Sequence, residues 1–327
     1  MEELYSKMIE LCPLPDRRLV FIFIKDRLLQ LSKRLQFRQQ SVATALVYLH
    51  RYFLFNPIQS VNLYQMVATV FYLASKTDES PHHVRLVSSE ARQAWPEYVS
   101  GDVSCIGELE FCLISEMHSQ LIVWHPYRSL MALKENQKLS PKHDPKLAIT
   151  NEELALAWSI VNDTFMTDIP LTTPPYLVAI VALFLAVVFV PNNPSLSLHL
   201  ANIDEGGADP NLFTSLGGQT GVSQIFGQAL GNIPGLATMQ SAARTGASVK
   251  PASLDRKVIK IKTVAAVASS DKIQNLVKFL IESDVNIARM IETTQVIISL
   301  YEIWETYNEK SVKDAINRSI RAQGLER

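Results

Sequence analysis

The chain has 327 residues, and 47% of them are hydrophobic, which is enough apolar material to build a core in each of two domains. Its formal net charge is −1, from 31 basic and 32 acidic side chains, so the overall charge offers no attraction to DNA or to an anionic membrane. We therefore expect protein partners, with no direct contact to nucleic acid and no membrane association.

The start of the chain and its cysteines indicate a protein made in the cytosol. Residues 1–16 contain acidic side chains and prolines where a signal peptide would need an apolar stretch. The three cysteines, Cys12, Cys105 and Cys112, include no C-x-x-C pair, which suits a reducing compartment and argues against a four-cysteine metal site. We expect all three to be buried as small hydrophobic residues.

Helical periodicity dominates the chain before His125. Val42, Leu46, Leu49 and Phe53 recur at spacings of three and four, which places them on one helix face. Asn62 has the character of an N-cap for the next helix, whose buried side should include apolar residues such as Met66 and Val70. Five helices are predicted here, two within 17–53 and one each over 63–76, 82–95 and 103–119.

A second helical set follows a polar stretch with prolines, which we interpret as a linker over 134–149. Thr150 and Glu153 have the spacing of a capping box and predict a helix that starts there and ends near Met166. Thr173 precedes Pro174 and Pro175, and a proline suits the first position of the next helix because its missing N–H is not needed there. The apolar run over 176–190 is too short for a typical membrane span and is better explained as a buried core helix.

Residues 191–269 differ in kind, because nine of the chain's twelve glycines lie in this range with little apolar periodicity. This composition predicts a mostly disordered insertion. Helical periodicity returns over 271–281, 284–307 and 310–321. In the second of these helices the predicted buried stripe consists of Ile287, Ile291, Val296, Leu300 and Trp304. No strand-like pattern appears, so the predicted fold class is all-α.

Five strings in the chain are similar to those of one protein family. FRQQSVATALVYLHRYF (37–53) resembles the second helix of the first cyclin box, and YLASKTDE (72–79) resembles the end of the third. LIVWHPYRSL (121–130), AWSIVNDTFMT (157–167) and SLYEIWETY (299–307) resemble the cyclin C family in particular. The resemblance covers about three quarters of the chain and fails across the insertion.

The resemblance implies two tandem cyclin-box domains of five helices each, with the disordered insertion inside the second. The implied division is an N-terminal segment 1–13, a kinase-binding first box 14–133, a linker 134–149, a second box 150–321 with its insertion 191–269, and a tail 322–327. The family's usual aromatic-rich first helix, which helps to choose the kinase, is not recognisable before Leu14. This implies either weaker selectivity for the kinase or a shortened form.

Membership of this family would make the chain a regulatory subunit with no catalytic group, metal or cofactor of its own. Cyclins of this type bind and activate the Mediator-associated cyclin-dependent kinase in the nucleus and so regulate RNA polymerase II transcription. They do so by pushing inward the kinase helix whose glutamate meets the ATP-contacting lysine. The resemblance also implies contact with other subunits of the Mediator kinase module.

Four residues match positions of the family that face the kinase: Lys76, Asp78, Glu79 and Glu110. Lys76 and Glu110 would form charge-assisted hydrogen bonds to kinase loops. At Asp78 the family usually has glutamate, so the side chain here is one methylene shorter. The alternative explanations are a solvated helix end for Lys76 and an ordinary helix-face carboxylate for Glu110.

Three further residues, Asn162, Asp163 and Tyr301, match a polar groove between the boxes where relatives are thought to receive another Mediator subunit. A hydrogen-bonded network that only packs helices together explains these residues equally well.

Three other functions remain to be weighed against a Mediator cyclin. An enzyme would need a reactive or metal-binding constellation, and the adjacent His82 and His83 point in different directions on a helix. A general transcription factor could have the same two cyclin-like domains and bind promoter DNA directly. Such a protein would be expected to carry a positive net charge and often a zinc ribbon. A cyclin for another transcriptional kinase is disfavoured by the strings at 121–130 and 157–167.

Overall fold

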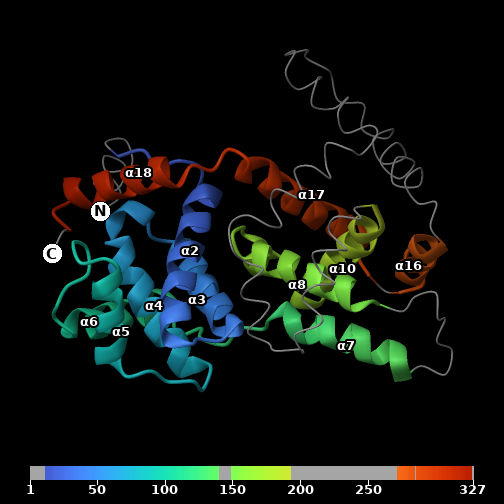
Figure 1. Cartoon of the computed structure of the whole chain (residues 1–327), viewed down its shortest axis with the longest axis horizontal. Helices are drawn as coiled ribbons and strands as arrows, with labels where there is room; N and C mark the ends of the chain where they lie inside the picture. The colour runs from blue at the N-terminus through green and yellow to red at the C-terminus, as the bar shows by residue number, and fades with distance from the viewer. Residues whose placement is uncertain (1–11, 140–148, 193–270, 284, 326–327) are drawn as a thin grey trace, which may run out of the picture. The chain divides into compact units, whose positions relative to one another are not determined.

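The computed structural model describes residues 12–139, 149–192, 271–283 and 285–325. In these ranges all regular elements are helices, which confirms the predicted all-α class (Figure 1). The helices before His125 are α2 (Arg17–Leu35), α3 (Gln39–Tyr52), the 3-10 turn η1 (Ile58–Ser60), α4 (Leu63–Thr77), α5 (Val84–Ala94) and α6 (Ser104–Glu116). After it come α7 (Pro126–Leu139), α8 (Asn151–Thr164), α9 (Ile169–Thr172), α10 (Pro175–Asn192), α16 (Asp271–Glu282), α17 (Ile287–Trp304) and α18 (Glu309–Ala322).

The chain forms two compact units, each assembled from more than one segment. Unit 1 comprises Met1–His125, Asn162–Pro174 and Val296–Arg327, and unit 2 comprises Pro126–Val161 and Pro175–Gln295. The predicted box boundaries stay a prediction, although α7 continues to Leu139, so that residues 134–139 are helical where a linker was expected. Nearly all of the predicted insertion 191–269 lies outside the described residues, as does most of the segment 1–13.

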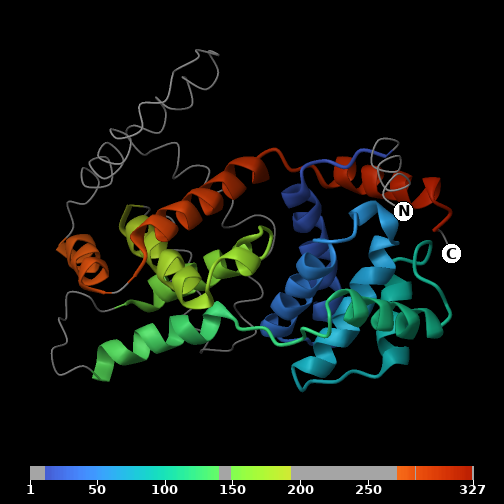
Figure 2. The ribbon, with the colours of Figure 1, turned by 180° about the vertical axis from the view of Figure 1, so that it is seen from behind.

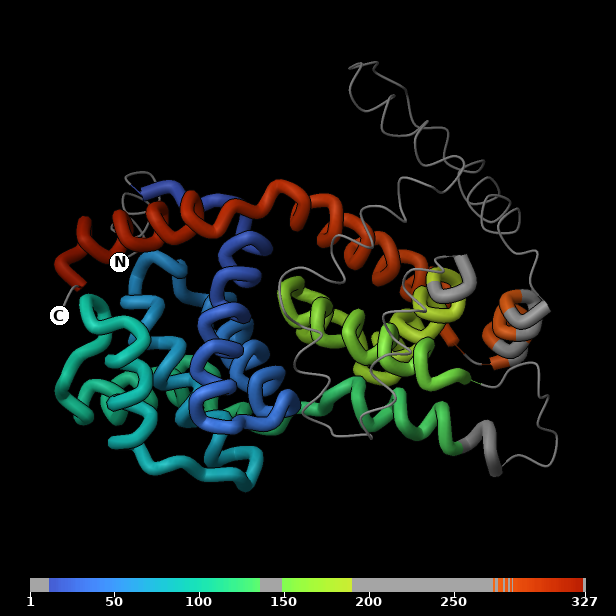
Figure 3. The backbone as a smooth tube through the Cα atoms, viewed as in Figure 1, coloured from blue at the N-terminus to red at the C-terminus, as the bar shows by residue number. Residues whose placement is uncertain are grey.

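Helix α4 lies at the centre of unit 1, where it packs against α2, α3, α5 and α6 (Figure 3). Asn62 caps this helix as predicted, because its side-chain oxygen accepts hydrogen bonds from the backbone N–H groups of Tyr64 and Gln65 at 3.1 and 3.3 Å. Met66 and Val70 are completely buried. The apolar sequence of α4 is therefore explained by contacts with four neighbouring helices.

The helical pattern over 17–53 is interrupted once, between α2 and α3. Gln36 adopts a left-handed conformation with φ of 51°, and the N–H of Phe37 donates to the carbonyl of Ser32 at 3.0 Å. This geometry closes the C-terminal end of α2. Phe37 is then buried against Phe71, with ring centroids 4.0 Å apart.

Helix α18 belongs to unit 1 and packs against α2 and η1 (Figures 1 and 2). It buries Val312, Ile316 and Ile320, and its Glu309 forms an ion pair with Arg27 of α2. The helix predicted over 310–321 thus packs onto α2 in the same unit.

Unit 2 contains the predicted capping box at the start of α8. The N–H of Thr150 donates to Glu153 Oε2 at 2.8 Å, and the N–H of Glu153 donates to Thr150 Oγ1 at 3.2 Å. Helix α10 starts at Pro175, the second of the two prolines at which a start was predicted, and packs against α7 and α16. Within the described ranges, no helix combines the length and the apolar character needed to cross a membrane.

Two predictions about burial were wrong. None of the three cysteines is fully buried: Cys112 is exposed on the outer face of α6, and Cys12 and Cys105 are partly buried. In α17 the residues Ile287, Ile291 and Val296 are exposed, while the buried face consists of Met290, Thr293, Ile297, Leu300 and Tyr301. The expected stripe shared only Leu300 with that face, since this helix carries apolar residues around most of its circumference.

Candidate functional site

The C-terminal end of α4 brings three of the predicted kinase-facing residues together. Asp78 is the C-cap, and its N–H donates to the carbonyl of Ala74 at 3.0 Å. Glu79 then takes a left-handed conformation with φ of 54°, which allows the N–H of Ser80 to donate to Ser75 O at 3.0 Å. Lys76 and Glu79 are both exposed at this helix end.

Lys76 forms an ion pair with Glu110 of α6. Its ammonium nitrogen also lies 4.5 Å from the centroid of the Tyr72 ring, which attracts the positive charge. Glu110 is buried, whereas the Lys76 side chain is 40% exposed. The pair therefore presents a lysine on the surface whose direction is set by a buried carboxylate behind it.

Asp78 is held by a different set of partners. Thr44 Oγ1, on α3, lies 3.0 Å from Asp78 Oδ2 and 2.8 Å from Nε2 of His125. Burial lowers the pKa of His125 to about 4, so its imidazole is neutral at physiological pH despite the nearby carboxylate. The four predicted residues thus divide into a Lys76–Glu110 pair, a tethered Asp78 and an exposed Glu79.

An extended segment after α6 runs beside this end of α4. The Tyr48 hydroxyl donates to the carbonyl of Leu121 at 2.6 Å and lies 3.0 Å from the hydroxyl of Thr77. Arg51 donates to the carbonyl of Ile122 at 3.1 Å. These bonds fix the backbone of residues 121–125 against α3, next to the residues that follow Lys76.

Large apolar side chains on these elements point to solvent. Phe111, adjacent to Glu110, is 78% exposed, and Ile122 and Trp124 of the extended segment are 75% and 71% exposed. Exposed apolar side chains close to oriented charges are typical of protein interaction sites. We call Lys76, Asp78, Glu110, Phe111, Ile122 and Trp124 the docking surface.

The second predicted set, Asn162, Asp163 and Tyr301, is buried within unit 1. Asp163 accepts hydrogen bonds from Lys25 Nζ at 2.8 Å and from the Tyr301 hydroxyl at 2.9 Å, and Gln39 donates to Asn162 at 3.2 Å. Burial, with the carboxylate of Asp163 beside it, raises the pKa of Tyr301, which keeps its hydroxyl protonated as a donor. The contacts indicate helix packing, and the predicted contact with another Mediator subunit stays a prediction.

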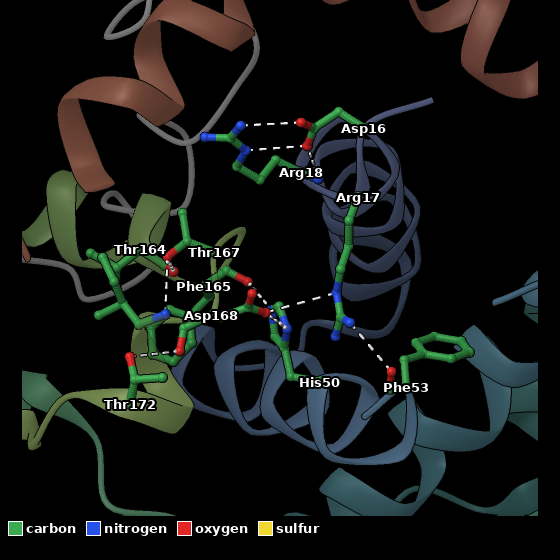
Figure 4. Close-up of polar contacts among 11 residues, drawn as sticks. Asp16, Arg17, Arg18, His50, Phe53, Thr164, Phe165, Thr167, Asp168 and Thr172 are labelled. Atoms are coloured by element: carbon green, nitrogen blue, oxygen red, sulfur yellow. Dashed lines mark hydrogen bonds and ion pairs between the residues drawn. The ribbon is translucent and has the colours of Figure 1, made fainter. Parts of the chain in front are cut away.

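A neighbouring polar cluster in unit 1 joins α2, α3 and the turn after α8 (Figure 4). His50 Nε2 donates to the carbonyl of Phe165 at 2.9 Å, and its Nδ1 lies 3.5 Å from Asp168. Arg17 approaches the same carboxylate at 3.8 Å and donates to the carbonyl of Phe53 at 3.3 Å. Burial lowers the pKa of His50, while the hydrogen bond with His50 lowers that of Asp168.

Sequence reasoning missed several residues of these sites. Thr44 and Trp124 lie within quoted family strings and Phe111 lies between two of them, but the strings alone do not tell which side chains are buried and which reach the surface. Lys25 ends the apolar run 19–24 and is followed directly by Asp26 and Arg27, so nothing in the sequence distinguished it from an exposed charge. Among the described residues, no group of three or more His, Cys, Asp or Glu side chains is placed to hold a metal ion.

Comparison with known proteins gives a family model that matches part of unit 1 and relatives that match nearly the whole chain. The family model for the cyclin N-terminal domain matches residues 17–112, which include the four predicted kinase-facing residues. RNA polymerase II holoenzyme cyclin-like subunits from Aspergillus fumigatus and Aspergillus oryzae are each 39% identical, covering 96% of this chain and 87% of theirs. The protein of the same description from Gibberella moniliformis is 38% identical over 327 residues, covering 100% of this chain and 92% of its own.

Among solved structures, a chain of the CAK complex from Chaetomium thermophilum is similar with a TM-score of 0.45 and 18% sequence identity, covering 77% of this chain and 88% of its own.

Proposed function

Because the chain belongs to the family of RNA polymerase II holoenzyme cyclin-like subunits, we propose that it is the regulatory subunit of the nuclear, Mediator-associated cyclin-dependent kinase. In this role it contributes no catalytic group. It binds the kinase through the docking surface of unit 1 and stabilises the active position of the kinase helix that carries the conserved glutamate. Other subunits of the Mediator kinase module are its further partners.

The observation that carries the proposal is the Lys76–Glu110 ion pair, together with exposed apolar side chains on α6 and on the segment that follows it. A lysine fixed by a carboxylate and an aromatic ring loses little conformational freedom when it donates to a kinase backbone carbonyl. Phe111, Ile122 and Trp124 offer the apolar contacts that supply most binding energy in such interfaces. The surface therefore combines an orienting polar centre with apolar anchors.

Binding of the purified chain to the Mediator kinase and to an unrelated cyclin-dependent kinase tests the proposal. Lys76 and Glu110 are replaced together by alanine, because removal of one partner would leave the other charge without compensation. Affinity for the Mediator kinase is expected to fall by about tenfold or more, the size of effect seen when a central interface group is removed.

The matched control removes an ion pair of the same charges elsewhere in unit 1. Arg34 of α2 and Glu90 of α5 lie 3.3 Å apart, and their replacement by alanine should leave kinase affinity unchanged. Equal losses in both double variants would contradict a specific docking role. Salt-sensitive binding to promoter DNA without binding to either kinase would instead support the DNA-gripping alternative.

A further inference from the structure

We propose that Thr44 and His125 are positioning residues that orient the Asp78 carboxylate for contact with the kinase. This inference rests on the proposed function and deepens it, because it assigns roles at the docking surface to two residues that the family pattern did not single out. Neither residue needs to touch the kinase. They act through Asp78, at the end of α4.

The directions of the hydrogen bonds follow from the groups present. Thr44 Oγ1 has one hydrogen, and an ionised carboxylate can only accept, so the 3.0 Å contact with Asp78 requires that Thr44 donate to it. The Thr44 oxygen must then accept from Nε2 of His125, which lies 2.8 Å away. His125 Nε2–H therefore donates to Thr44, and the Thr44 hydroxyl donates to Asp78.

The Thr44 hydroxyl has a second possible acceptor, the backbone carbonyl of Gln40. The carbonyl of Gln40, one helical turn before Thr44, lies 3.2 Å from the same hydroxyl and is the usual acceptor for a threonine inside a helix. The stronger charge-assisted bond to Asp78 takes the single hydrogen instead. The carboxylate is thereby held in one orientation, although it sits at a partly exposed helix end.

The hydrogen bond from Thr44 also compensates for the shorter side chain of Asp78. An aspartate reaches less far from the backbone than the glutamate usual in the family, so a small change in its torsion angles would turn the carboxylate away. Thr44 is buried and His125 is partly buried, so the freedom of both anchors is restricted. Preorganisation of this kind improves affinity by reducing the freedom lost on binding.

Kinase affinity in a double-mutant cycle tests the inference. Thr44→Val keeps the shape of the side chain but removes the donor, and it should weaken binding by about 3- to 10-fold, as expected for one hydrogen bond. Thr44→Ser keeps the hydroxyl and should restore most of the affinity. Combined with Asp78→Asn, Thr44→Val should cause little additional loss, since it acts through that carboxylate.

His125 offers a second pair of variants. His125→Phe removes the Nε2 donor, whereas the amide nitrogen of His125→Gln can replace it, so only the phenylalanine variant should weaken binding. Thermal unfolding of each variant shows whether the chain remains folded. An NMR measurement of the imidazole nitrogens in the free protein should find a neutral His125 with its proton on Nε2.

The outcomes separate this inference from the function on which it rests. Losses that simply add in the Thr44→Val and Asp78→Asn cycle, or an unprotonated Nε2, overturn the positioning roles while leaving the kinase assignment intact. A wild-type chain that does not bind the Mediator kinase overturns both.

Discussion

Lys25 and Asp163, which are 138 positions apart in the sequence, form an ion pair inside unit 1 with 2.8 Å between Nζ and Oδ1. Both side chains are almost completely buried. Asp163 also accepts from Tyr301, and the Lys25 ammonium lies 5.5 Å from the centroid of the Trp304 ring. One carboxylate therefore connects α2 with the end of α8 and with α17.

We expect Lys25→Met to lower the free energy of unfolding by about 3–5 kcal/mol, because it leaves the buried Asp163 carboxylate without its counter-charge. Combined with Asp163→Leu, the loss should be clearly smaller than the sum of the two single losses. Urea unfolding measures these differences. Losses that add would show that the two side chains do not depend on each other.

Stability should decrease as the pH falls from about 6.5 to about 4. The pKa values of His50 and His125 are lower in the folded chain than the ordinary value of 6.5, so the unfolded chain binds more protons over this range. The charged groups facing these rings are Arg17 and Asp168 for His50, and Asp78 for His125. The pKa of Asp168 is lowered below 3.8, so its own contribution is lost only at still lower pH.

Replacement of His50 or His125 by glutamine should make this dependence on pH shallower, which urea midpoints at several pH values measure. The control is His83→Asn, because His83 is exposed and asparagine can still cap α5. An unchanged slope in both buried-histidine variants would refute the assignment.

The capping box of α8 should contribute measurably to unit 2. Thr150→Ala removes the acceptor for the Glu153 N–H and should destabilise the chain by about 1 kcal/mol, whereas Thr150→Ser retains it. Chemical unfolding followed by circular dichroism compares the two variants. Equal stability of Thr150→Ala and wild type would mean that water replaces the cap at no cost.

Gln36→Gly should stabilise the protein. Gln36 is exposed and has φ of 51°, a conformation that glycine adopts without the steric penalty of a side chain. Part of this gain is offset by the greater freedom of glycine in the unfolded chain, so we expect a net increase of about 0.5–1 kcal/mol. Gln36→Ala, which keeps a Cβ atom, is the matched comparison and should give no such increase in the unfolding midpoint.

Local sequence signals predicted the helices well because their causes are local. The Asn62 cap, the Thr150–Glu153 box and Pro175 at a helix start each act within one turn, and all three lie where they were expected. The buried face of α17 was predicted incorrectly, since it depends on which neighbours cover the helix. Periodicity cannot identify those neighbours when apolar residues surround the axis.

The candidate site could be predicted only in part for the same reason. The resemblance to the family identified Lys76, Asp78, Glu79 and Glu110, of which the first three lie at one helix end and the fourth lies on the neighbouring α6. The partners that orient Asp78 come from elsewhere in the chain: Thr44 is on α3, and His125 is the last residue of the segment 121–125. No short-range pattern links residues 34 or 81 positions apart.

Unit 1 is built from three separate segments of the chain, which affects when it can fold during synthesis. Its first segment leaves the ribosome long before residues 162–174, and the segment from Val296 follows last of all. At typical synthesis rates, Asp163 is added to the growing chain roughly 7–28 seconds after Lys25. Until then the Lys25 charge has no buried partner. Helices α2 to α6 therefore cannot complete their core until the later segments are made, and until then the side chains that will contact those segments are open to chaperones.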